Sequence, residues 1–273
     1  MCGILGMAFQ KEHKMEDAEV HLILKKLLMK SRMRGSAATG VAFVSLTKAV
    51  VIKHHIPATT FVETDFYKNA VLKYLDFSGK PSKTGFNTPL MVIGHTRAET
   101  KGTYLDRNNN HPIIAKQVVG VHNGVIGNDE HLWNLYGKKL TRAGKVDSEI
   151  IFRLIEHHAN SVGDSMVKAI KATSGMISGS YACAAVNLKM PWVLWLFKGY
   201  GTAFVYHYPN KGLILFASEN RFIQDTVANM KLGPAIQIPF DSFEGLGINL
   251  EQNRQAKFEL PDDKTAGLDY CHS

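Results

Sequence analysis

The segment that most constrains the fold is the apolar run Gly3-Ile4-Leu5-Gly6-Met7-Ala8-Phe9, which directly follows Cys2. A run of this length without a charge predicts a short buried strand, and its two glycines allow neighbouring backbone to pack closely. Such a strand is a rigid support. A reactive group at its start is therefore held in a fixed position.

Cys2 becomes the N-terminal residue once the initiator Met1 is removed. It then carries a thiol and a free α-amine, whose ordinary pKa values are about 8.5 and about 7.7–8.0. The amine can act as base for the thiol of the same residue, which is the pairing that covalent catalysis requires. Taken alone, Cys2 is more simply an incidental residue beside the start codon, so its interpretation depends on the rest of the chain.

Hydrophobic periodicity predicts helices around residues 20–28 and after Asp147. Strands are expected in two blocks, at residues 41–46, 50–52, 90–94 and 118–121, then at 181–186, 192–197, 203–208 and 213–217. Ser218 is expected to cap a helix that runs to Met230, and the chain beyond about Pro239 is expected to be polar and irregular. This order predicts antiparallel sheets with helices on their outer faces. No internal repeat or linker is evident, so we expect one domain over residues 1–273.

Composition is that of an ordinary globular protein, with 45% hydrophobic and 21% charged residues. The sequence has neither an apolar run long enough to span a membrane nor a leader before Cys2, so the cytoplasm is the expected compartment. The net charge of +8 favours an acidic or phosphorylated partner, but the scattered basic residues argue against nucleic-acid binding. Cys2, Cys183 and Cys271 have neither metal-ligand nor disulfide-framework spacing, and no metal or cofactor is expected.

Three polar clusters lie at predicted strand ends or at a helix start: residues 95–102, residues 122–128 and Asp147. Each has a simpler explanation when taken alone. Asn123-Gly124 is a common turn pair, Asp147 suits a helix cap, and an arginine in the first cluster suits the protein surface.

Together the clusters offer a set of groups for one reaction. Asn123 has a carboxamide N–H and Gly124 a backbone N–H, and two such donors aimed at one oxygen make an oxyanion hole. Arg97 can bind a carboxylate through two parallel hydrogen bonds, and Asp147 can bind an ammonium group. With the Cys2 thiol, these groups predict attack on an amino acid that has a side-chain carbonyl.

The sequence resembles the class II glutamine amidotransferase domain of the N-terminal-nucleophile hydrolases, as found in glucosamine–fructose-6-phosphate aminotransferase and amidophosphoribosyltransferase. The resemblance covers residues 2–235 and rests on motifs in family order. These are Cys2-Gly3-Ile4, Arg34-Gly35 with Gly40, His95-Thr96-Arg97 with Thr100 and Gly102, Asn110-His111-Pro112, His122-Asn123-Gly124 with Asn128, Asp147 with Glu149, Gly179-Ser180-Tyr181, and Ala217-Ser218-Glu219.

The resemblance implies an α+β fold, a four-layer αββα sandwich of two antiparallel sheets, with a core at 2–235 and a C-terminal extension at 236–273. It implies hydrolysis of L-glutamine to glutamate and ammonia, with Cys2 as the nucleophile and its α-amine as the base. By position, the implied contacts are Asn123 and Gly124 to the oxyanion, Arg97 to the glutamine carboxylate, Asp147 to its ammonium, Thr100 in the closing loop, His122 in the substrate site, and Arg34 behind it.

Two positions depart from the family pattern. Ala98 stands where the family usually has tryptophan, which is expected to change the lid over the site. Ala37 stands where the family usually has aspartate, which leaves the orientation of Arg34 open.

These residues support three hypotheses about function. The first is a glutamine amidotransferase that passes ammonia to a synthetase or transferase subunit in trans, since no acceptor-domain signature follows residue 235. The second is an amidase acting on another γ-glutamyl or acyl amide, against which Arg97 and Asp147 argue. The third is a non-catalytic binding subunit, which would retain Met1 or escape labelling by a glutamine-like electrophile.

Overall fold

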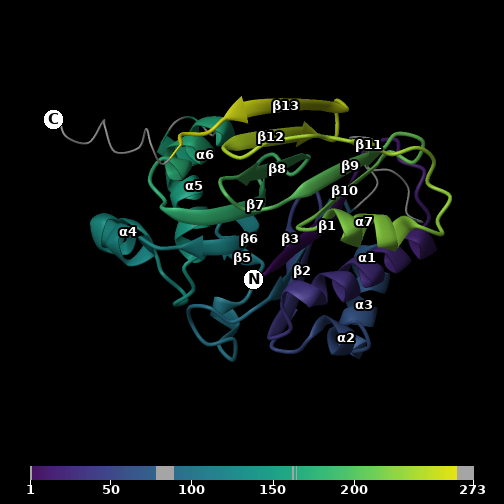
Figure 1. The fold of residues 1–273 in the computed structure, drawn as a ribbon, viewed down its shortest axis with the longest axis horizontal. Coiled ribbons are helices and arrows are strands. Elements are labelled where there is room, and N and C mark those ends of the chain that lie inside the picture. The colour runs from purple at the N-terminus through teal and green to yellow at the C-terminus, as the bar shows by residue number, and fades with distance from the viewer. Residues whose placement is uncertain (1, 78–88, 162, 164, 263–273) are drawn as a thin grey trace.

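The computed structural model describes residues 2–77, 89–161, 163 and 165–262. Two antiparallel sheets lie face to face in the middle of the molecule, and helices cover the outer face of each (Figure 1). This arrangement confirms the predicted four-layer αββα sandwich.

The first sheet has seven strands in the order β11-β9-β10-β1-β4-β2-β3. β1 lies between β10 and β4 and is antiparallel to both, so Cys2 precedes a strand that is hydrogen-bonded along its two edges. The strand bounds are β1 Gly3–Phe9, β2 Ala38–Val44, β3 Ala49–His54, β4 Met91–Arg97, β9 Phe204–Tyr208, β10 Leu213–Ala217 and β11 Ile236–Gln237.

The second sheet has six strands in the order β13-β12-β8-β7-β6-β5. β6 carries Asn123 and Gly124 and pairs with β7 along its whole length. The strand bounds are β5 Ile113–Ala115, β6 Val118–Ile126, β7 Gly179–Asn187, β8 Val193–Lys198, β12 Glu244–Asn249 and β13 Arg254–Glu259.

The expectation of a polar, irregular chain beyond about Pro239 is wrong. β12 pairs with β8, and β13 pairs with β12 at the edge of the second sheet. A Cβ at Gly247 would lie 2.7 Å from the Trp195 ring, so a residue typical of loops serves close packing here. The division between a core at 2–235 and an extension at 236–273 stays a prediction, although residues 244–259 are hydrogen-bonded into the second sheet.

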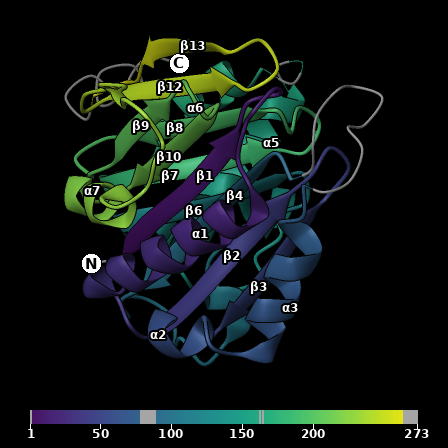
Figure 2. The same cartoon turned by 90° about the vertical axis from the view of Figure 1, so that its right-hand side faces the viewer.

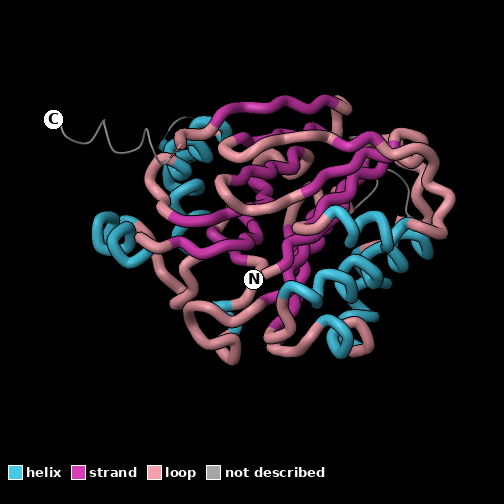
Figure 3. Tube along the Cα trace, viewed as in Figure 1, coloured by secondary structure: helices cyan, strands magenta, loops and turns pink. Residues whose placement is uncertain are grey.

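The helices form the two outer layers. The helices of the first sheet lie in front of that sheet in Figure 2 and beside it in Figure 3. The helices on the first sheet are α1 Asp17–Ser31, α2 Ala58–Phe61, α3 Asp65–Tyr74 and α7 Asn220–Val227. Those on the side of the second sheet are α4 Asp129–Tyr136, α5 Glu149–Ser161 and α6 Met166–Ser174. Short 3₁₀ turns are η1 Arg32–Arg34, η2 Arg107–Asn109 and η3 Gly137–Lys139.

The core explains why the run 3–9 is apolar throughout rather than alternating. Leu5, Met7 and Phe9 pack under the helices of the first sheet. Ile4 and Ala8 face the other way, into the core between the two sheets. Both faces of β1 are therefore buried, and the strand has no face for a polar side chain. In the part of the chain that the structure describes, no helix is long and apolar enough to cross a membrane.

Candidate active site

Cys2 lies at the start of β1, and its side chain is buried. Its Sγ is 3.5 Å from the carbonyl oxygen of Ala98, in the segment that follows β4. Burial raises the pKa of the Cys2 thiol, and the positive charge of Arg97 acts in the opposite direction. A raised pKa keeps the thiol protonated near neutral pH, so the nucleophile requires a base when it attacks.

Arg34 lies behind the nucleophile, in the η1 turn after α1. Its Nε donates a hydrogen bond to the backbone carbonyl of Cys2 at 2.9 Å. Its Nη1 donates to Glu219 Oε1 at 2.5 Å, just before α7. This ion pair fixes the orientation that Ala37 had left open. A Cβ at Gly35 would lie 2.3 Å from the backbone nitrogen of Ala98, so the turn packs directly against the end of β4.

Asn123 and Gly124 lie near the end of β6. Asn123 is buried, and its Nδ2 is 3.5 Å from Ser218 Oγ. Gly124 has φ of 145°, and a Cβ there would lie 1.9 Å from the carbonyl oxygen of Ser180. The backbone conformation and the lack of space both require glycine at this position.

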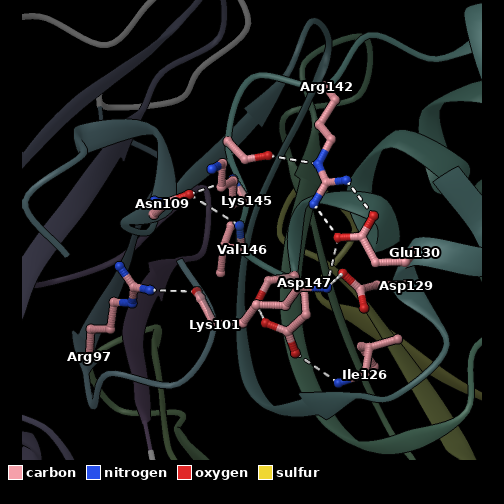
Figure 4. Close-up of polar contacts among 12 residues, drawn as sticks. Arg97, Lys101, Asn109, Ile126, Asp129, Glu130, Arg142, Lys145, Val146 and Asp147 are labelled. Atoms are coloured by element: carbon pink, nitrogen blue, oxygen red, sulfur yellow. Dashed lines mark hydrogen bonds and ion pairs between the residues drawn. The ribbon is translucent and has the colours of Figure 1, made fainter. Parts of the chain in front are cut away.

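Arg97 ends β4 and is only 1% exposed, so it is not a surface charge. Its Nη1 donates to Asn110 Oδ1 at 2.7 Å, and its Nη2 donates to the carbonyls of Lys101 at 2.8 Å and Gly102 at 2.5 Å. Figure 4 shows the bond to Lys101. A guanidinium has further N–H groups, so the fork keeps donors for a substrate carboxylate.

Asp147 lies two residues before α5 and is 2% exposed. Its Oδ2 accepts a hydrogen bond from the backbone N–H of Ile126 at 2.8 Å (Figure 4). The Ser148 hydroxyl is 3.5 Å from its Oδ1. The carboxylate thus ties the start of α5 to the end of β6, and it retains lone pairs for an ammonium group.

Two further predicted residues lie beside this group: the His122 ring lies next to Gly124, where a Cβ would be 2.8 Å from its Nε2, and Thr100 lies in the loop after β4. The His122 ring lies against the other face of β6 from Asn123, with Nδ1 2.7 Å from Ser148 Oγ and Nε2 3.4 Å from the Ser180 carbonyl. Thr100 is exposed, in the loop between β4 and η2.

A salt-bridge network that the sequence pattern does not predict holds this loop. Lys101 Nζ is 2.5 Å from Asp129 Oδ2 and 2.9 Å from Glu130 Oε1, both at the start of α4. Arg142 binds the Glu130 carboxylate with two parallel hydrogen bonds of 2.8 Å (Figure 4). In the sequence, the adjacent acidic residues 129 and 130 are the signal for this network, but their partner Lys101 lies far from them in the chain.

Ser218 was expected to cap a helix, and this prediction is wrong. α7 begins at Asn220, with Glu219 at the N-cap position. The Ser218 hydroxyl instead accepts a hydrogen bond from the backbone N–H of Ile4 at 2.9 Å. Ser218 and Glu219 belong to one sequence motif, but the motif did not predict a part in the site for either residue.

A buried cysteine at the start of a central strand, within an αββα sandwich, defines the class of N-terminal-nucleophile folds. Comparison with solved structures supports this class. Two solved structures match at 18% identity, and each match covers 96% of this chain and 50% of the other. One is glutamine phosphoribosylpyrophosphate amidotransferase from Bacillus subtilis, with a TM-score of 0.68. The other is described as the allosteric regulatory enzyme of purine biosynthesis, with a TM-score of 0.69.

Sequence comparisons identify the family within this class. A family profile described as a glutamine amidotransferase domain matches residues 95–225. A glutamine–fructose-6-phosphate aminotransferase (isomerizing) of Wigglesworthia glossinidia brevipalpis is 30% identical over 71% of this chain and 28% of its own length. A 7-cyano-7-deazaguanine synthase of Sulfolobus acidocaldarius is 22% identical over 83% of this chain and 45% of its own length. The chain therefore carries a class II glutamine amidotransferase domain. It spans less than half the length of each of these two relatives.

Proposed function

We propose that this chain hydrolyses L-glutamine to glutamate and ammonia through a glutamyl thioester on Cys2. The observation that carries the proposal is the position of the Cys2 thiol, buried at the start of β1 and 3.5 Å from the carbonyl of Ala98, in the segment that begins with Arg97. A buried thiol with a raised pKa suits activation by an adjacent base rather than a preformed thiolate.

The proposed reaction proceeds in two steps. The thiol proton passes to the α-amine of Cys2 while Sγ forms a bond to the amide carbon of glutamine. The amide oxygen becomes an oxyanion that accepts hydrogen bonds from Asn123 and Gly124. The carbon–nitrogen bond then breaks, and ammonia leaves with the proton from the amine. Water adds to the thioester, which releases glutamate and restores the thiol.

The remaining groups bind the charged ends of the substrate or support the site. Arg97 binds the glutamine carboxylate, and Asp147 binds its ammonium, so both charges of a free amino acid are recognised. Thr100 belongs to the loop that closes over the substrate. Arg34 holds the backbone of Cys2. His122 lines the substrate site beside Gly124, and its ring is held there by contacts with Ser148 and the Ser180 carbonyl.

Glutamine hydrolysis by the purified chain tests the proposal, with covalent labelling by a diazo-ketone glutamine analogue as the second readout. Cys2→Ala is expected to abolish both. Cys183→Ala is the matched control, because Cys183 is a second buried thiol, on β7. Labelling that persists in Cys2→Ala would place the nucleophile elsewhere. Intact mass must show loss of Met1, because an active chain that retains Met1 has no free amine to act as the base.

The second candidate is an amidase for another γ-glutamyl or acyl amide. It differs from the first only in what occupies the site beside Arg97 and Asp147. Competition between free glutamine and N-acylated or carboxamide derivatives separates the two. Preference for a derivative that lacks either charge would favour the amidase. Absence of both hydrolysis and labelling would favour a non-catalytic binding subunit.

We further propose that the ammonia passes to an acceptor enzyme in trans. The relatives support a coupled acceptor, since most of their length lies outside the part that this chain matches. The net charge of +8 favours an acidic surface on the partner. Pull-down from the native host, with glutaminase activity measured on the complex, tests this. Full activity of the purified chain without stimulation by host extract would contradict it.

A further inference from the structure

Ser218 links the strand of the nucleophile to the strand of the oxyanion hole. It follows β10 directly and is completely buried. Its backbone N–H donates to the carbonyl of Ile4 at 2.9 Å, and its hydroxyl oxygen accepts from the N–H of the same residue at 2.9 Å. These two bonds hold Ser218 in a fixed place against Ile4, which lies two positions after Cys2 in the chain.

Asn123 approaches the same hydroxyl from the second sheet. Its carboxamide nitrogen is 3.5 Å from Ser218 Oγ, and its buried Oδ1 has no hydrogen-bond partner among the residues that the structure describes. An unsatisfied buried acceptor is costly, and the oxygen and nitrogen of a carboxamide are distinguished by their hydrogen bonds rather than by shape. The orientation of this side chain is thus decided by what surrounds it.

The hydroxyl group of Ser218 sets the orientation of the Asn123 carboxamide. Because Ser218 Oγ already accepts the N–H of Ile4, its own proton needs an acceptor. A half-turn of the Asn123 carboxamide brings Oδ1 to the hydroxyl, which satisfies the unpaired oxygen. The same half-turn moves the two N–H groups away from Ser218, to the side where Oδ1 now lies without a partner.

We propose that Ser218 is a positioning residue, which turns the N–H groups of Asn123 into the oxyanion hole by donating its hydroxyl proton to Asn123 Oδ1. The inference rests on the proposed glutaminase function, because it assigns the oxyanion role to Asn123. It identifies the residue that makes Asn123 a donor, and it joins the nucleophile and the oxyanion hole through one relay: Ile4 N–H to Ser218 Oγ, and Ser218 O–H to Asn123 Oδ1.

A double-mutant cycle on glutamine hydrolysis tests the relay. Asn123→Ala is expected to lower kcat by about 10²–10³-fold, as loss of one oxyanion donor does. Ser218→Ala is expected to lower kcat by about ten-fold or more with KM nearly unchanged, since the interaction it supports forms only in the transition state. In the Asn123→Ala background, Ser218→Ala is expected to add almost no further loss. Ser218→Thr keeps the hydroxyl and is expected to restore most of kcat.

Alkylation of Cys2 by iodoacetamide separates this role from a structural one. The alkylation does not use an oxyanion hole, so Ser218→Ala is expected to react at the wild-type rate. Equal losses of kcat in both Asn123 backgrounds would overturn the proposal. So would a parallel fall in alkylation, because Ser218 would then position β1 instead of Asn123.

Neutron diffraction of the wild-type chain tests the relay without relying on activity. The expected result is a Ser218 deuteron directed at Asn123 Oδ1. A carboxamide that presents its nitrogen to Ser218 would overturn the inference even in an active enzyme. A wild-type chain without glutaminase activity would instead refute the proposed function, and the neutron result would still decide how Ser218 and Asn123 are bonded.

Discussion

Arg97 and Asp147 carry opposite charges, and both are almost fully buried. Each already binds protein groups, Arg97 the carbonyls of the following loop and Asp147 the N–H of Ile126. A buried charge is stable only when it is paired or hydrogen-bonded, so these bonds allow the charges to exist before the substrate arrives. The proposed substrate contacts therefore act through side chains that also shape the site.

Asp147 accepts the N–H of Ile126 and is proposed to bind the substrate ammonium, and one substitution can separate these two roles. Asp147→Asn keeps an oxygen for the N–H of Ile126 but removes the charge that faces an ammonium group. We expect KM for glutamine to rise about 10–100-fold, the equivalent of a charged hydrogen bond of about 1.5–3 kcal/mol, with the free energy of unfolding nearly unchanged. Asp147→Ala should raise KM similarly and also lower stability. Wild-type KM in Asp147→Asn would show that the substrate pose is wrong.

At the scale of elements, the regular part of the fold could be predicted, because the strands of the two sheets are apolar and short. β12 was missed because Gly245 and Gly247 interrupt its pattern, and β13 because an exposed edge strand has no apolar face to detect. The candidate site residues could be recognised from their motifs. The parts played by Ser218 and Lys101 could not, because each depends on a contact with a segment distant in the sequence.

Whether β12 belongs to the core can be tested by making the same Leu→Ala substitution at a buried position on β12 and at an exposed position elsewhere. Leu246 on β12 is fully buried, whereas Leu72 on α3 is 65% exposed. Leu246→Ala is expected to lower the free energy of unfolding by about 2–5 kcal/mol, and Leu72→Ala by less than about 0.5 kcal/mol. Urea unfolding measures both. Equal small effects would mean that residues 244–249 add little to the stability of the domain.

The loop after β4 is predicted to depend on its tether to α4. Lys101→Met removes the partner of Asp129, whose side chain is 4% exposed, and leaves a buried carboxylate unpaired. Because the carbonyls of Lys101 and Gly102 bind Arg97, we expect faster hydrogen exchange across residues 98–110 and a several-fold higher KM. Lys68→Met is the matched control, since Lys68 and Glu63 form an exposed pair worth about 0–1 kcal/mol. Similar effects of the two variants would contradict the tether.

At the scale of the whole molecule, the two sheets meet through a polar contact as well as through the apolar core. His95 on β4 donates from Nε2 to the backbone carbonyl of His122 on β6 at 3.0 Å. The ring of His111 stacks on His95 with 4.0 Å between ring centroids. All three histidines are buried. Burial lowers the pKa of each, and the charges of Arg97 and Lys53 lower it further for His95 and His111.

This buried cluster predicts how the stability of the chain depends on pH. Burial lowers the pKa of His95 to about 3, and it lowers that of His13, a half-buried histidine outside this cluster, to about 4, against 6.5 in the unfolded chain. Below pH 6.5 the unfolded chain binds protons that the folded chain excludes, so the contribution of these groups to stability is complete above pH 6.5. This contribution declines as the pH falls from 6.5 towards about 4 for His13 and about 3 for His95, and below those values it is fully lost. His95→Gln keeps a donor for the His122 carbonyl but does not titrate, so its urea midpoint should decline less steeply between pH 6.5 and pH 4. Equal slopes in the wild type and His95→Gln would mean that other groups control acid unfolding.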